Sequence, residues 1–71
     1  METQRGIMGD YTKKIHKILR DNGCYFVRSG KGDHKIWYSP IINSTFSIDG
    51  KIKNRIAANE YLKNAGINRK V

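Results

Sequence analysis

The sequence is poor in the residues that cross-link or anchor many small proteins. Cys24 is the only cysteine among 71 residues, so an internal disulfide, and with it a secreted, disulfide-stapled fold, is excluded. No apolar run approaches the roughly 18 residues that a membrane span requires, and no segment has the apolar middle of a secretory signal. We therefore expect a cytoplasmic protein without a membrane partner, in which Cys24 is a small buried residue.

Soft metal ligands are equally scarce. The sequence has three soft metal ligands, Cys24, His16 and His34, and their spacing matches no zinc pattern. We therefore expect no metal and no other cofactor.

Acidic residues are few, six against 14 basic ones, which gives a formal net charge of +8. On so short a chain this excess indicates a polyanionic partner. The alternative is a lysine-rich soluble surface without specific meaning, but the basic residues recur beside turns and aromatic residues. A membrane surface is disfavoured, because neither predicted helix pairs a basic face with bulky aromatic anchors.

The length allows one small domain with a thin core. Residues 1–9 show little periodicity, and we expect them to be a flexible N-terminal arm before a single domain at 10–71. A first helix is predicted from apolar residues that share one helical face: Tyr11, Ile15, Ile18 and Leu19. Asp10 or Thr12 can cap its start, and Gly23 can end it in the left-handed conformation.

Three segments rich in aromatic and β-branched residues predict strands at 24–29, 34–39 and 44–48, separated by turn signals. A second helix is predicted within 52–65, capped by Asn54 and ended by Gly66. Its apolar stripe has the following members: Ala58, Leu62 and Ala65, widened by Ile56 and Tyr61. The expected fold is α+β, in the order α-β-β-β-α, with a three-stranded antiparallel sheet and both helices on one face.

The segment at 28–40 holds the residues best suited to binding a phosphate and transferring a proton. His34 begins a strand directly after a glycine turn, with three cations close in sequence: Arg28, Lys31 and Lys35. The backbone N–H groups of the turn, at Gly32 and its neighbours, can hold a phosphate oxygen, and the cations can bind the phosphodiester. Histidine can accept a proton near neutral pH.

RNA would supply the nucleophile of such a reaction, its own 2′-OH group. Removal of the 2′-OH proton lets that oxygen attack the adjacent phosphate, which leaves a 2′,3′-cyclic phosphate and a 5′-OH end without a metal. DNA lacks this nucleophile. The residues do not identify the group that protonates the leaving oxygen, which can be a lysine, a tyrosine or water.

Plainer interpretations exist for these residues. A single histidine beside a turn is often only a surface residue, and Gly-Lys-Gly has neither P-loop nor dinucleotide spacing. His16, in mid-helix, is expected to be an ordinary surface histidine. Trp37 and Tyr38 are adjacent on a strand and must face opposite sides. One of them belongs to the core and the other can stack on a base, but the pattern does not say which.

Several motifs occur in a distinctive order along residues 11–67: Gly23, Arg28, Gly32, His34, Trp37-Tyr38-Ser39-Pro40, Asp49-Gly50-Lys51-Ile52-Lys53-Asn54-Arg55, Ala58-Asn59 and Ala65-Gly66-Ile67. This set resembles the HicA (YcfA-like) toxins of bacterial toxin–antitoxin pairs. The most specific part is Arg-x-x-x-Gly-x-His at 28–34 with the aromatic strand that follows.

The resemblance implies a fold similar to a double-stranded-RNA-binding domain, and an mRNA-cutting activity that needs neither ribosome nor metal. It also implies silencing by a HicB-type antitoxin that covers the active site, and a catalytic role for His34. Many family members have Ser or Thr before this histidine, whereas this chain has Asp33. Lys51, Lys53 and Arg55 are predicted RNA contacts on charge grounds only.

The sequence thus favours an endoribonuclease that acts on mRNA and is monomeric when isolated. A non-catalytic RNA-binding module with the same basic surface is the main alternative. A DNA-binding regulator is disfavoured, because the strands separate the two predicted helices and leave no helix-turn-helix.

Overall fold

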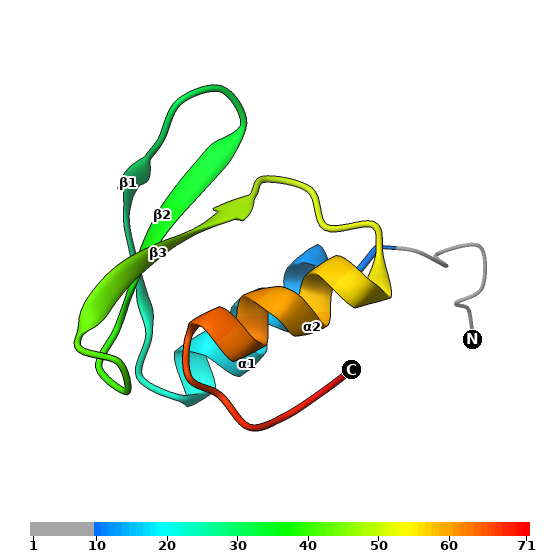
Figure 1. Cartoon of the computed structure of the whole chain (residues 1–71). Helices are drawn as coiled ribbons and strands as arrows, with labels where there is room; N and C mark the ends of the chain where they lie inside the picture. The colour runs from blue at the N-terminus through cyan, green and yellow to red at the C-terminus, as the bar shows by residue number, and fades with distance from the viewer. Residues whose placement is uncertain (1–9) are drawn as a thin grey trace.

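The computed structural model describes residues 10–71, so the arm expected at 1–9 lies outside the described residues. Two helices and three strands follow one another: α1 Thr12–Asp21, β1 Tyr25–Ser29, β2 His34–Ser39, β3 Ser44–Asp49 and α2 Arg55–Asn64 (Figure 1). The predicted α-β-β-β-α order is confirmed. None of the described helices is long and apolar enough to cross a membrane.

The sheet is antiparallel throughout, with β2 in the centre and β1 and β3 as its edges. Alternation along β2 divides its side chains between two faces. Trp37 and Ser39 are buried on the inner face together with Ile48 of β3. His34 and Tyr38 belong to the outer face. Of the two adjacent aromatic residues, Trp37 is therefore the core residue.

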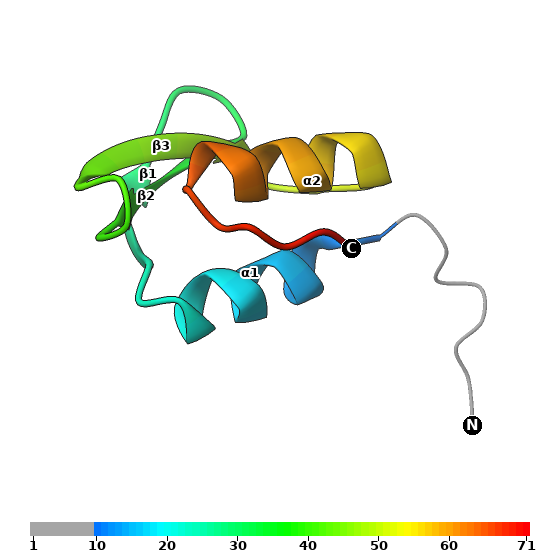
Figure 2. The ribbon, with the colours of Figure 1, turned by 60° about the horizontal axis from the view of Figure 1, so that its bottom comes forward.

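Both helices pack against the inner face of the sheet and run in the same direction, and the C-terminal segment passes back between them (Figure 2). One core joins helix and sheet residues: Ile15, Ile18, Leu19, Cys24, Trp37, Ile48, Ile52, Ala58, Leu62, Ala65 and Ile67. The burial of Cys24 is confirmed. Tyr61 packs partly against this core, but Ile56 is 77% exposed, so its predicted place in the apolar stripe is wrong.

The helix ends follow from local chemistry. At the start of α1 the Asp10 carboxylate accepts from the Thr12 N–H at 3.2 Å, and at the start of α2 the Asn54 side chain accepts from two backbone N–H groups. Gly23 and Gly66 are left-handed, with φ of 86° and 82°. The residue after each glycine donates its N–H back into the helix, Cys24 to Leu19 O and Ile67 to Leu62 O, both at 2.9 Å. The predicted cap of α2 by Asn54 and the predicted ends at Gly23 and Gly66 are confirmed. At α1 the N-cap residue is Tyr11, which makes no side-chain cap hydrogen bond, so the predicted cap by Asp10 or Thr12 is wrong.

A buried hydrogen bond joins the end of β2 to the end of α2. The Ser39 hydroxyl, which is fully buried, donates to the Ala65 carbonyl at 2.7 Å and accepts from the Ile41 N–H at 3.2 Å. This contact joins the last turn of α2 to the end of β2, and His34 lies at the other end of that strand.

Candidate functional site

His34 and Asp49 form a pair on the outer face of the sheet. His34 begins β2, Asp49 ends β3, and the two are direct partners in the register. His34 Nδ1 lies 3.2 Å from Asp49 Oδ1, and the side chains are 57% and 48% exposed. Both groups are therefore anchored by strands and still accessible to a ligand.

A carboxylate 3.2 Å from Nδ1 favours one nitrogen of His34 as the reactive one. When Nδ1–H donates to a carboxylate, the imidazole is held in the tautomer that leaves Nε2 as a proton acceptor. The pair thus has the parts of a general base, an oriented ring and an accessible nitrogen.

Sequence reasoning missed Asp49 because it assigned this residue to a turn. A usable signal was present in the connection at 40–43, which makes Ser39 and Ser44 partners. Counting from that pair towards the start of β2 and towards the end of β3 brings His34 opposite Asp49.

The glycine turn before His34 presents free backbone donors. The His34 N–H donates to Lys31 O at 3.3 Å and the Gly30 N–H donates to His34 O at 2.8 Å. Gly32 has a φ of +65°, a conformation that most side chains other than asparagine adopt only with strain. Among the described residues, no backbone acceptor is bonded to the N–H groups of Lys31, Gly32 or Asp33. These exposed donors can bind an anion next to His34.

The turn is anchored to the connection between β3 and α2. Gly50 N–H donates to Asp33 O at 2.7 Å. A Cβ on Gly50 would lie 2.5 Å from Asp33 Oδ1 and 2.8 Å from Asp33 O, so only glycine allows this close approach. The Asp33 carboxylate consequently lies against Gly50, and it is Asp49, not Asp33, that pairs with His34.

Three predicted RNA-contact cations lie near this end of the sheet. Arg28 is exposed and is the register partner of Ile36 on the outer face. Lys31 is exposed in the turn, and Lys51 is exposed directly after Gly50. Near His34 these three cations and the free N–H groups are accompanied by two carboxylates, Asp33 and Asp49, so the cations outnumber the acidic groups by one.

The other three predicted cations are not gathered there. Lys35 is half-buried and belongs to the opposite face of β2 from His34. Lys53 lies near the start of α1: hydrogen bonds from Thr12 lower the pKa of Asp10, and the Lys53 charge lowers it further. Arg55 is exposed in the first turn of α2.

A second group that sequence reasoning did not connect with His34 is Tyr61 of α2. Burial raises the pKa of the Tyr61 hydroxyl, and the neighbouring Asp49 carboxylate raises it further. The Tyr61 phenol of α2 therefore lies near the Asp49 carboxylate.

His16 is not the ordinary surface histidine that was expected. Its ring lies 5.1 Å from that of Trp37, it is half-buried, and its Nε2 is buried without a hydrogen-bond partner among the described residues. Burial lowers the pKa of His16, and the charge of Arg20 lowers it further. Because Trp37 is on the inner face, His16 is separated from His34 by the sheet.

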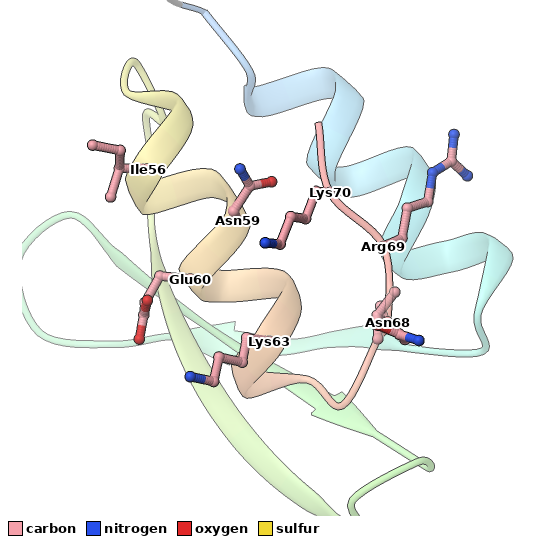
Figure 3. A pocket seen from close by; sticks show the side chains of 8 residues that line it. Ile56, Asn59, Glu60, Lys63, Asn68, Arg69 and Lys70 are labelled. Carbon is pink, nitrogen blue, oxygen red and sulfur yellow. The ribbon is translucent and has the colours of Figure 1, made fainter.

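A hollow of about 500 Å³ lies elsewhere, between α2 and the C-terminal segment (Figure 3). Lys63, Arg69 and Lys70 contribute to its lining together with Glu60, and it contains neither histidine nor cysteine. Within residues 10–71, no three His, Cys, Asp or Glu side chains are grouped so that they could hold a metal ion. The His34 end of the sheet is thus the better candidate for chemistry.

No family model, no curated protein and no solved structure matches this chain.

Proposed function

We propose that the chain is a metal-independent endoribonuclease of the HicA toxin type, with His34 as the general base. The observation that supports this most directly is the exposed His34–Asp49 pair beside the free N–H groups of the turn. It combines a proton acceptor with donors for an anion, which is what cleavage through a 2′-OH requires.

In the proposed reaction, His34 Nε2 takes the 2′-OH proton. The 2′ oxygen forms a bond to phosphorus while the bond from phosphorus to the 5′ oxygen breaks. The leaving oxygen takes a proton from a lysine, a tyrosine or water. Lys31 and the turn N–H groups bind the non-bridging oxygens as their charge grows. The products are a 2′,3′-cyclic phosphate and a 5′-OH end.

The partners of this proposal are those of the resemblance. The substrate is mRNA, the inhibitor is a HicB-type antitoxin that covers the His34 site, and the compartment is the cytoplasm. The fold is of the double-stranded-RNA-binding-domain kind, and the isolated chain is monomeric.

A non-catalytic RNA-binding module is the second candidate. It is favoured by the tyrosine pair of an exposed Tyr25 and a half-buried Tyr38, whose ring centroids are 5.3 Å apart and which can bind RNA without cutting it. Both candidates predict RNA binding that weakens with salt, so binding measurements do not separate them.

The test is cleavage of a long RNA in EDTA by wild type, His34→Ala and His16→Gln, with the new ends identified. We expect wild type and His16→Gln to leave 2′,3′-cyclic phosphates and His34→Ala to leave the RNA intact. RNA binding without cleavage by wild type would favour the binding module. Equal cleavage by wild type and His34→Ala would remove the assigned role of His34.

A further inference from the structure

The outer face of the sheet carries an aromatic pair on the same side as His34. Tyr25 of β1 and Tyr38 of β2 are direct register partners, with ring centroids 5.3 Å apart and an angle of 32° between the ring planes. Tyr25 is 56% exposed, and Tyr38 is half-buried. Both helices pack on the opposite face, so no described element covers this pair.

The Tyr38 ring is held in place. Its hydroxyl donates to the side chain of Asn43 in the connection between β2 and β3. A tyrosine ring that is oriented by a hydrogen bond and still accessible on one side loses little conformational freedom when a flat ligand stacks on it.

A cation lies between the tyrosines and the histidine. Outer-face positions of β2 are Tyr38, Ile36 and His34 in order, and Arg28 of β1 is the partner of Ile36. At about 3.3 Å per residue, Tyr38 and His34 are roughly 13 Å apart along the strand. The outer face therefore presents an aromatic platform, a guanidinium and the imidazole in one line.

We infer that this face binds single-stranded RNA, with a base stacked on the Tyr25–Tyr38 platform and the phosphate backbone passing Arg28 to reach His34. The path of the RNA backbone towards His34 rests on the proposed ribonuclease function. The stacking of a base on the tyrosine platform does not depend on that function. The platform would be a base-binding subsite at a distance from the cleaved bond.

Single-stranded RNA fits this face better than a duplex or a protein. A base can stack on a side chain only when it is not enclosed in a helix, and duplex RNA is bound mainly through its backbone and 2′-OH groups. The strongly positive chain complements a phosphate backbone, with Arg28 exposed between the platform and His34 and Lys31 exposed in the turn beside His34. The β3 positions that complete the face are Thr45 and Ser47, both polar and exposed, and the half-buried Asp49 beside His34.

The test uses the full chain with His34→Ala, so that the RNA stays intact, and a labelled oligoribonucleotide of about ten nucleotides. Binding is measured by fluorescence anisotropy. We expect Tyr38→Ala to weaken binding about tenfold, as the loss of one stacked base predicts. Tyr38→Phe keeps the ring but loses the hydrogen bond to Asn43, so it should bind much more tightly than Tyr38→Ala and only slightly more weakly than the parent. The control Ile56→Ala removes an exposed apolar side chain from α2 and should also bind like the parent.

A set of oligonucleotides with one abasic site at each position in turn identifies the stacked base. When both tyrosines are present, an abasic site at one or two positions should weaken binding about tenfold. In the Tyr38→Ala variant, an abasic site at any position should leave the affinity unchanged. Tyr25→Ala provides a second variant with little risk to folding, because its side chain is already more than half exposed. Unchanged affinity in both tyrosine variants, or equal binding of the matching duplex, would overturn the inference.

The two proposals can fail separately. If wild type cuts long RNA but the abasic series shows no sensitive position, the platform is rejected and the ribonuclease stands. If the abasic series behaves as expected but wild type does not cut RNA in EDTA, the platform stands and the catalytic role of His34 is rejected.

Discussion

Asp49 Oδ1 lies 3.2 Å from His34 Nδ1, across a directly paired row of β2 and β3. The two residues are fifteen positions apart in sequence, and only the register of the hairpin joins them. In the proposed reaction Asp49 is a positioning residue, because it acts on the RNA only through the ring of His34.

Loss of the Asp49 carboxylate should slow cleavage without removing RNA affinity. Asp49→Ala is expected to lower kcat by about 10- to 100-fold, because the ring loses its fixed tautomer and orientation. In the His34→Ala variant, the additional change Asp49→Ala should cause no further loss of cleavage activity. The matched control is Asp33→Asn, which alters a carboxylate adjacent in sequence that does not pair with His34. A larger loss from Asp33→Asn than from Asp49→Ala would contradict the assignment.

The cations near His34 should contribute to RNA affinity, whereas those on α2 should not. Lys51→Gln is expected to weaken binding and to reduce the slope of log K against log salt by about one, as for one lost phosphate contact. Lys63→Gln removes another exposed lysine, beside the α2 hollow, and should leave the slope unchanged. Titrations of both variants at several salt concentrations measure this, and identical slopes would argue against a localised RNA path.

Gly50 should tolerate no side chain. A Cβ there meets the carboxylate and carbonyl oxygens of Asp33, so Gly50→Ala is expected to destabilise the fold by about 1–3 kcal/mol and to lower activity by displacing the turn. The contrast is Gly32→Asn, where nothing lies within 4 Å of the added Cβ and asparagine accepts a positive φ. Urea unfolding compares the two, and a smaller effect at Gly50 than at Gly32 would count against the close contact.

The Ser39 hydroxyl should stabilise the fold measurably. Ser39→Ala leaves the Ala65 carbonyl and the Ile41 N–H without this partner, for an expected loss of about 1–3 kcal/mol. Its register partner Ser44 is exposed and makes only a 3.5 Å contact, so Ser44→Ala should change stability by less than about 0.5 kcal/mol. The comparison uses the free energies of unfolding of the two variants. Equal free energies of unfolding would mean that the buried hydrogen bonds of Ser39 do not stabilise the fold.

Folding stability should fall in mild acid because of His16. Its pKa is lowered in the folded protein, chiefly by burial, so the unfolded chain takes up this proton at a higher pH. Stability is therefore lost as the pH falls through the ordinary histidine value of about 6.5, and this loss ends below the pKa of folded His16. His16→Gln should show a smaller drop between pH 7.5 and pH 5.5. Parallel curves of unfolding midpoint against pH would exclude His16 as the cause.

The sequence alone was sufficient wherever the deciding interactions are local. Gly23 and Gly66 end their helices, Asn54 caps α2, and β2 has the predicted bounds, because each of these depends on the chemistry of a few consecutive residues. The position of His34 directly after a glycine turn followed from the same kind of signal.

The tertiary structure decided what depends on register and on which face of the sheet the helices cover. Periodicity places Trp37 and Tyr38 on opposite faces, but only the packing of α1 and α2 makes Trp37 the buried one. The same packing buries the edge of His16 against Trp37 and separates Lys35 from His34. Asp49 joins His34 through the register of the β2–β3 hairpin. The connection at 40–43 is compatible with this register, but the packing of the sheet fixes it, because a strand shifted by one residue would turn its side chains to the other face.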